Sequence, residues 1–235
     1  MQPIPSGANY MAYDRTIVVF SPDGRLLQVE YAREAVKRGS TSIGVRVKDA
    51  VVLGATKRTT PLGVPESYKK IYEIDSHIGL VSSGLLSDAR DLVEISRVKA
   101  QINRITFGEP ISVASLTKHI CDRKHMVTQY AGVRPYGVGL LIGGVDDRPT
   151  LYETDPSGTM IEWKAQAIGR GADKAKKVLE KEYKENMEVA AGIKLVLRAL
   201  KAGERETADA ENPEVAVIKA GGFKRLGPED IKSHA

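Results

Sequence analysis

The chain has 235 residues, 42% of them hydrophobic, so it can bury a full core as one domain. Its formal net charge of +5 comes from 35 basic and 30 acidic residues mixed along the sequence, which is not the footprint of a nucleic-acid-binding protein. A single cysteine, Cys121, excludes an intrachain disulfide and favours a reducing compartment, so we expect a cytoplasmic protein. No stretch reaches the ~20 apolar residues of a membrane span, and the first dozen residues lack the pattern of a secretory signal.

The segment from residue 13 to residue 44 carries the clearest pattern in the chain. The apolar residues 17–20 lead into Ser21-Pro22-Asp23-Gly24, whose residue types favour a chain reversal. The spacing of apolar residues after this turn predicts an amphipathic helix over 26–38 that ends at Gly39. Its inward positions are Leu26, Val29, Ala32 and Val36.

Two strand pairs and two helices are predicted next. Residues 42–46 pair with 50–55, and residues 70–74 pair with 78–82, with a proline- and glycine-containing loop between the two pairs. A helix of about twenty residues begins at Leu86 and stops by Gly108. A second helix begins after Ser112, with inward residues Val113, Leu116, Ile120 and Val127.

The second half of the chain repeats this rhythm of strands followed by helices. The predicted strands are 138–144, 150–154, 160–163 and 165–168, and the predicted helices centre on 175–183 and 190–200. Residues 204–213 are charged and predicted to be loose, before a strand over 215–218 and a helical turn over 228–233. Strand blocks that alternate with helix pairs predict two stacked, largely antiparallel sheets with helices outside both, an α+β fold.

Several short strings stand out along this sequence. Near the amino-terminal end they are Tyr13-Asp14-Arg15, Phe20 to Leu26, Gln28 to Ala32 and Gly39-Ser40-Thr41. Later ones are Ser83-Gly84-Leu85, Gly132 to Gly137, Asp155 to Gly158 and Ala167-Ile168-Gly169. Together they closely resemble proteasome α-type subunits, the archaeal kind in particular, over nearly the whole chain. The resemblance implies a four-layer α-β-β-α sandwich, with residues 1–15 as a flexible gate arm and 16–235 as one domain.

Gly39-Ser40-Thr41 raises the question of catalysis, because the same sandwich carries threonine proteases whose nucleophile is the first residue of the processed chain. Such an enzyme uses the free α-amine of that residue as proton acceptor, with a lysine and an acidic neighbour beside it. By the resemblance Ser40 is the nucleophile and Lys70 the lysine, but the acidic position holds Lys57 and a serine position holds Arg170. A second cation would repel Lys70, with no carboxylate to hold it, and cleavage after Gly39 would discard the helix 26–38. We therefore expect no catalytic residue.

Other chemical signals are weak. Cys121 and His125 are four residues apart on a predicted helix, a spacing that can serve a metal, but His119 lies off that face and no third ligand is near in sequence. Gly169-Arg170-Gly171 lacks the Lys-Ser/Thr of a phosphate loop and is better explained as a turn. We expect neither a metal nor a cofactor.

The resemblance instead implies sites for partners. The family has a pocket between adjacent α subunits that receives the carboxy-terminal carboxylate of an activating ATPase or cap, and a lysine ammonium suits that task. The matching residues are Lys70, Glu30, Arg33, Gly84 and Leu85. A lone lysine pair such as Lys69 and Lys70 could also be simply solvated.

The resemblance also assigns a gate and a channel constriction. The gate residues are Tyr13, Asp14 and Arg15 in the arm, with Pro22 and Tyr31 holding the reverse turn at its base. The constriction is the loop Tyr130, Ala131, Gly132 and Val133, in which Ala131 stands where relatives often have glycine. An ordinary disordered end and an ordinary surface loop are the alternatives.

The expected function is therefore that of a non-catalytic α subunit. It would form a homo-oligomeric ring, seven copies in the family, that docks on catalytic β subunits, binds an activating ATPase or similar cap and admits unfolded protein. Two other classes stay open: an autoprocessing hydrolase, whose mature chain would lack residues 1–39, and a basic module that binds nucleic acid. No interleaving of aromatic and basic residues supports the latter.

Overall fold

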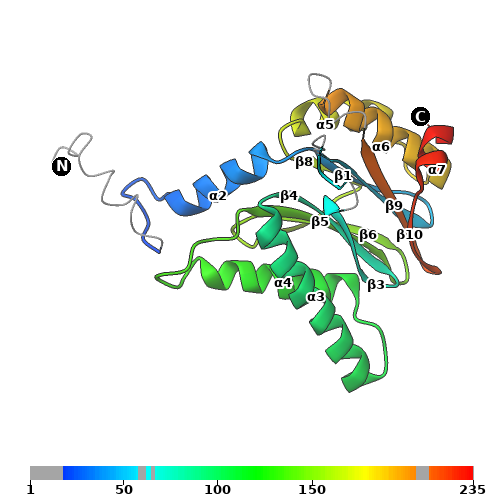
Figure 1. The fold of residues 1–235 in the computed structure, drawn as a ribbon. Helices are drawn as coiled ribbons and strands as arrows, with labels where there is room; N and C mark the ends of the chain where they lie inside the picture. The colour runs from blue at the N-terminus through cyan, green and yellow to red at the C-terminus, as the bar shows by residue number, and fades with distance from the viewer. Residues whose placement is uncertain (1–17, 58–61, 65–66, 205–211, 235) are drawn as a thin grey trace.

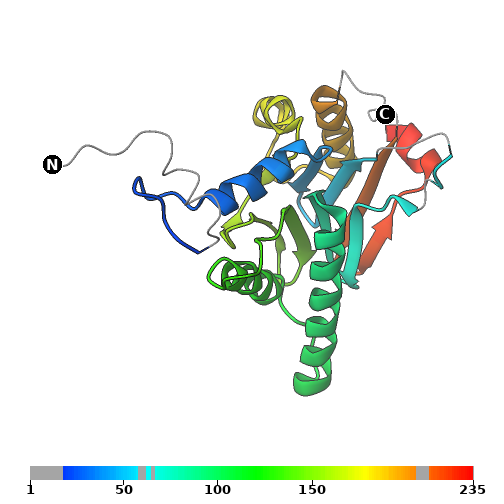
Figure 2. The ribbon, with the colours of Figure 1, turned by 60° about the vertical axis from the view of Figure 1, so that its left-hand side comes forward.

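The computed structural model describes residues 18–57, 62–64, 67–204 and 212–234. In this part of the chain two five-stranded sheets stack face to face between two layers of helices (Figure 1), which confirms the predicted four-layer α+β sandwich. One more helix, α2 (Leu27–Arg38), projects from the body in both ribbon views (Figures 1 and 2). It contacts the second sheet and then leads directly into the first.

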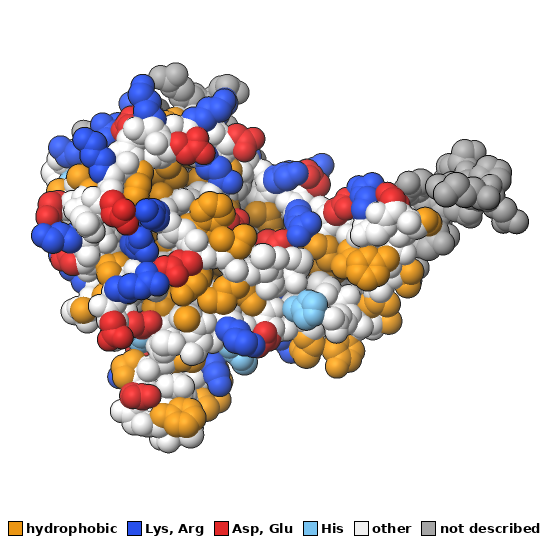
Figure 3. Space-filling view, turned by 180° about the vertical axis from the view of Figure 1, so that it is seen from behind, with side chains coloured by type: hydrophobic (Ala, Val, Ile, Leu, Met, Phe, Trp, Pro, Cys, Tyr) orange, Lys and Arg blue, Asp and Glu red, His pale blue; other side chains and the backbone are white. Residues whose placement is uncertain are grey.

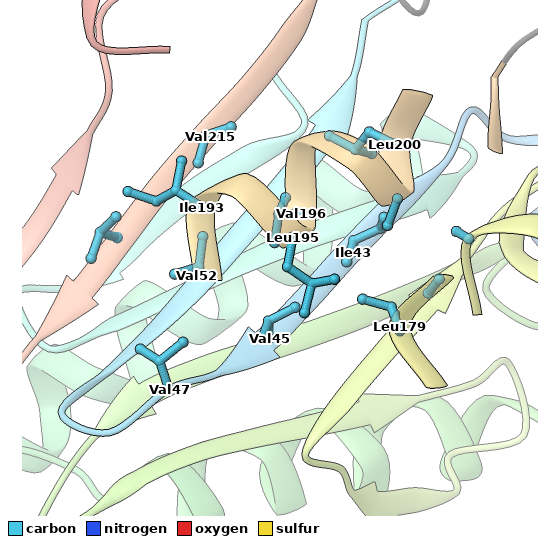
Figure 4. Close-up of a cluster of buried hydrophobic side chains, with 14 of the residues drawn as sticks. Ile43, Val45, Val47, Val52, Leu179, Ile193, Leu195, Val196, Leu200 and Val215 are labelled. Carbon is cyan, nitrogen blue, oxygen red and sulfur yellow. The ribbon is translucent and has the colours of Figure 1, made fainter. Parts of the chain in front are cut away.

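The first sheet has the strand order β10-β9-β2-β1-β8, and all its neighbouring strands are antiparallel. Its outer face packs against α5 (Ala172–Glu182) and α6 (Val189–Gly203). Figure 4 shows this core, with valines of the sheet beneath Ile193 and Val196 of α6. The strands are β1 (Ser42–Arg46), β2 (Ala50–Thr56), β8 (Ala165–Ile168), β9 (Pro213–Lys219) and β10 (Gly222–Arg225).

The second sheet has the strand order β3-β4-β5-β6-β7, again antiparallel throughout. Its outer face packs against α3 (Leu86–Phe107) and α4 (Val113–Val127). All eight residues of the central strand β5 are buried, as the nearly continuous apolar run predicts for a strand covered on both faces. The strands are β3 (Ile71–Asp75), β4 (Ile78–Gly84), β5 (Val138–Val145), β6 (Pro149–Thr154) and β7 (Met160–Glu162).

The inner faces of the two sheets meet in an apolar core that includes Val51, Leu53, Leu141 and Leu151. Glycines allow this close approach. A Cβ on Gly143 of β5 would lie only 2.5 Å from a methyl group of Val51 in the opposite sheet. This core therefore holds the two sheets together, and the polar residues described below lie at the ends of the strands.

Two sequence expectations need correction. Strand β10 was not predicted, although it pairs with β9 and precedes α7 (Pro228–His234). Glu204 was predicted to open a loose charged segment, but it is buried at the end of α6, where it accepts several hydrogen bonds. The rest of that segment, residues 205–211, lies outside the described residues.

Candidate functional site

The junction between α2 and β1 brings Ser40 and Lys70 together. The Lys70 ammonium donates hydrogen bonds to the carbonyl oxygen of Ser40 at 2.7 Å and to its hydroxyl at 2.8 Å. The Ser83 hydroxyl donates to the same carbonyl at 3.1 Å, and the Arg170 amide donates to the Gly39 carbonyl at 2.8 Å. In the unprocessed chain the Ser40 nitrogen is a peptide amide, which cannot accept a proton as a free α-amine would.

A carboxylate does lie at this junction, contrary to the sequence expectation. Glu214 of β9 is buried, and its Oε2 lies 3.5 Å from the Lys57 ammonium and accepts the Lys70 amide at 3.3 Å. Arg225 pairs with its other oxygen. Glu214 therefore pairs with two cations, Lys57 and Arg225, and also accepts the Lys70 amide. Its position is set by the pairing of β2 with β9, which brings together residues remote in sequence.

Arg170 forms a polar cluster with two buried residues, Glu204 and Thr41. One oxygen of Glu204 accepts the Thr41 amide at 2.8 Å and the Thr41 hydroxyl at 2.7 Å. The other oxygen accepts two hydrogen bonds from the Arg170 guanidinium, at 2.9 and 2.8 Å. Arg170 thus stands in an ion pair that ties the start of α5 to the end of α6, and Glu204 is the partner that sequence reasoning missed.

Gly84 and Leu85 lie beside this junction at the end of β4. Gly84 has φ +114°, and a Cβ there would come within 2.2 Å of the Gly137 carbonyl oxygen, so only glycine fits. The Leu85 amide donates to the same oxygen at 2.9 Å, while the Leu85 side chain is 43% exposed. Lys70 thus contacts Ser40 and Gly84 lies against Gly39, so both lie at the α2–β1 junction, and Leu85 follows Gly84 in the chain.

Glu30 and Arg33 lie farther along α2. A bidentate pair with Arg25 lowers the pKa of Glu30. Arg33 donates to Asp155 from two nitrogens, at 2.9 and 2.8 Å, and so fastens α2 to the turn after β6. In this chain Glu30 is therefore held by Arg25, and Arg33 is held by Asp155 and Ser157.

The gate and constriction residues are described only in part. Tyr13, Asp14 and Arg15 lie outside the described residues. Pro22 sits in a turn closed by a hydrogen bond from the Ser21 amide to the Arg25 carbonyl at 2.9 Å, and Tyr31 is half-exposed on α2. The loop of residues 130–133 is exposed and turns at Gly132, where φ is +87°. Seen from behind (Figure 3), hydrophobic side chains gather on the projecting part of the molecule.

A cavity of about 410 Å³ lies where α2 faces the start of α5. Its polar lining is of mixed sign and includes Arg33, Lys37, Asp155, Arg170 and Lys176. No sequence pattern pointed to it, because its walls come from four separate segments of the chain. The balance of cations and carboxylates favours neither a strong anion nor a strong cation.

The remaining candidate ligands do not converge within the described residues. Cys121 is buried, which raises the pKa of its thiol, and its sulfur lies 3.7 Å from the Thr159 carbonyl. In the described ranges no three His, Cys, Asp or Glu side chains gather as a metal site would require. Over the same ranges, the helices are too short or too polar for any of them to traverse a bilayer.

Comparison with known proteins places the chain in a family. The family model described as "Proteasome subunit" matches residues 36–218, and the model of the N-terminal signature of A-type proteasome subunits matches residues 13–35. The chain therefore belongs to the proteasome subunit family. It is 54% identical to the alpha subunit of the Methanopyrus kandleri proteasome, over 94% of this chain and 91% of that one. The corresponding protein of Methanothermobacter thermautotrophicus is 51% identical, over 100% of this chain and 94% of the relative. Within the family, the chain is thus an alpha subunit of the core particle.

Proposed function

We propose that this chain is a non-catalytic subunit that forms the outer ring of a cytoplasmic proteasome core particle. Seven copies would make the ring, which docks on catalytic β subunits, binds an activating ATPase or similar cap and admits unfolded protein. The observation that carries this proposal is the Gly39-Ser40 junction. The Arg170 amide holds the Gly39 carbonyl, and Lys70 and Ser83 hold the Ser40 carbonyl. These contacts on both sides of the Gly39-Ser40 bond support a chain that keeps α2. Without a free α-amine at Ser40 a peptidase reaction would lack its general base, and loss of a general base typically lowers the rate about 10²- to 10⁴-fold.

The pocket for an activator would centre on Lys70. Its ammonium would receive a terminal carboxylate, Gly84 would let the backbone of the partner approach, and Leu85 would pack against the partner's preceding side chains. Within one chain Glu30 pairs with Arg25, and Arg33 pairs with Asp155. They would complete the pocket from a neighbouring copy, so the ring itself would be needed for binding.

The gate would be the segment of residues 1–15, with Tyr13, Asp14 and Arg15 as its gating motif. The turn at Pro22 lies at its base, and Tyr31 of α2 would support that turn. In an order–disorder switch of this kind, a ligand that binds near the turn and favours one state shifts the equilibrium between the two states. Residues 130–133 would form the constriction below the gate.

A pair of lysine variants tests the pocket. In the assembled complex, Lys70→Ala is expected to abolish the stimulation of peptide hydrolysis by an activator's carboxy-terminal peptide. Lys69→Ala is the matched control, because Lys69 is the exposed neighbour of Lys70 and should leave stimulation unchanged. Full stimulation of the Lys70→Ala complex would remove the pocket from the proposal.

The second candidate is an autoprocessing peptidase, because the Lys70 ammonium lies 2.8 Å from the Ser40 hydroxyl. The two functions differ in the mass of the purified chain. The subunit proposed here keeps all 235 residues, with a mass of 25.6 kDa. A mature chain that starts at Ser40 and cleaves peptides without a partner would establish the peptidase. Negative-stain images would test the ring directly, since seven-fold rings are expected.

A further inference from the structure

Gly137 and Val138, between the loop of residues 130–133 and β5, are held by two buried polar side chains. The Gly137 amide donates to Asp88 at 2.8 Å, and the Val138 carbonyl accepts from the Lys124 ammonium at 2.8 Å. The Gly137 carbonyl accepts from the Leu85 amide at 2.9 Å. These three hydrogen bonds tie the short segment to α3, to α4 and to the pocket residue Leu85.

Asp88 connects this segment to the loop itself. It lies in the first turn of α3 and is only 7% exposed. The Arg134 guanidinium donates to both of its oxygens, at 2.6 and 2.7 Å, and Arg134 directly follows Val133. Although burial raises it, the hydrogen bonds from Arg134 and Gly137 bring the pKa of Asp88 below its ordinary value. Asp88 therefore remains charged and grips both ends of the Arg134–Gly137 stretch.

Lys124 grips the segment from α4. Its side chain is completely buried, and its ammonium donates a second hydrogen bond, at 3.3 Å, to the Thr154 carbonyl at the end of β6. The next residue, Asp155, is the partner of Arg33 on α2. Lys124 thus joins the start of β5 to the turn that fastens α2.

We infer that Asp88 and Lys124 are positioning residues that fix the loop of residues 130–133 relative to Leu85 and α2. The inference rests on the proposed function, in which that loop borders the channel and Leu85 lines the activator pocket. Core packing alone does not require such groups, because well-packed apolar residues often replace a buried ionic group with no loss of stability. Charged hydrogen bonds to Gly137, Val138 and Thr154 fix the position of the main chain, which an apolar side chain cannot do.

The test uses the full chain assembled with its catalytic β subunits, with an activator's carboxy-terminal peptide present. Asp88→Asn weakens the hydrogen bonds from α3 to Arg134 and Gly137. Lys124→Met removes the hydrogen bonds from α4 to the Val138 and Thr154 carbonyls. Asp91→Asn is the matched control, because Asp91 lies on the same helix as Asp88 and accepts a hydrogen bond from Tyr136 of the Arg134–Gly137 stretch, but at the surface. Three quantities are measured: degradation of an unfolded protein, hydrolysis of a short peptide and the melting temperature.

Complexes with Asp88→Asn or Lys124→Met are expected to degrade the unfolded protein about threefold faster or more, the size of effect that substitutions at coupled positions typically have. Short-peptide hydrolysis is expected to change little. Lys124→Met should speed degradation without a lower melting temperature, which separates positioning from a merely structural role. If either buried variant fails to assemble, Arg134→Ala replaces it, because the Arg134 side chain is 58% exposed. Rates equal to those of the Asp91→Asn control would overturn the inference.

A further variant separates failure of this inference from failure of the proposed function. Val133→Trp narrows the loop opening without touching the grip, so it should slow degradation of the unfolded protein if residues 130–133 border the channel. No effect of Val133→Trp would remove the constriction itself. An effect of Val133→Trp together with wild-type rates for the Asp88 and Lys124 variants would remove only the positioning role.

Discussion

Lys124 allows the sharpest prediction, because its ammonium lies in the core between α4 and the second sheet. Burial lowers the pKa of Lys124 from 10.5 to about 8. The groups that face it are Cys121, Asp155, Asp88 and Glu153, and their charges only partly oppose this shift. A difference of this size corresponds to about 3 kcal/mol between the folded and unfolded chains.

The sign follows from the order of the two pKa values. Between pH 8 and the unfolded value of 10.5, the unfolded chain holds the Lys124 proton and the folded chain has released it. The contribution of Lys124 to stability therefore rises with pH across this range, and at pH 7 the charged amine costs its full amount. Lys124→Met removes that cost but leaves the Val138 and Thr154 carbonyls without their donor. The advantage of Lys124→Met over the wild type should thus shrink by about 2–3 kcal/mol between pH 7 and pH 10.

Denaturant unfolding at a series of pH values measures this difference, with the fluorescence of Trp163, the one tryptophan, as the signal. Comparing two proteins at each pH cancels the titration of groups that they share. Lys118→Met is the control, since Lys118 lies on the same helix with a side chain that is 70% exposed. A difference between Lys124→Met and the wild type that stays constant over this range would refute the reasoning, because it would mean that the amine is hydrated in the folded protein.

Three further predictions concern the surrounding contacts. Gly84→Ala should lower the free energy of unfolding by about 2 kcal/mol or more, because its Cβ would strike a main-chain oxygen. Gly108→Ala has open space, so denaturant unfolding of both should give a clearly larger loss at Gly84. Glu204→Gln should lower stability by about 2 kcal/mol and the melting temperature with it, since Arg170 loses the charge that pairs with it; an unchanged melting temperature would contradict this. Asp155→Asn should leave overall stability within about 1 kcal/mol, because Arg33 is half-exposed, yet speed amide exchange in α2 but not in α5. If Asp155→Asn changes the amide exchange rates of α2 no more than those of α5, the Arg33–Asp155 pair does not hold α2 in place.

Periodicity predicted most of the fold because burial and element type agree there. The run after Leu86 is helical to Gly108, where the αL cap ends α3, and the apolar run of β5 is buried as expected. Contacts between remote segments could not be read in this way. Glu204 and Glu214 looked like ordinary charged residues, and only the closing of α6 and β9 onto the first sheet buries them.

Lys124 did carry a signal that the sequence interpretation left unused. It follows Ile120 by four residues and precedes Val127 by three, so the helical spacing puts it on the buried face of α4. A charged residue on an apolar face requires partners. Those partners are main-chain carbonyls of Val138 and Thr154, which have no signature in a sequence.

At the Ser40 junction a serine hydroxyl and a lysine ammonium lie within hydrogen-bond distance, yet the contacts there hold the chain in place. Cleavage after Gly39 would release α2, whose residues Leu27, Val29 and Ala32 are buried, and each large apolar side chain exposed costs about 1.5–3 kcal/mol. The chemistry and the packing therefore oppose processing together. A carboxylate that arrives at Lys70 must share the ammonium with the Ser40 carbonyl and hydroxyl, so its binding would loosen the carboxy-terminal attachment of α2. A carboxylate bound in the proposed pocket would then affect the proposed gate through α2, which follows the gate segment in the chain.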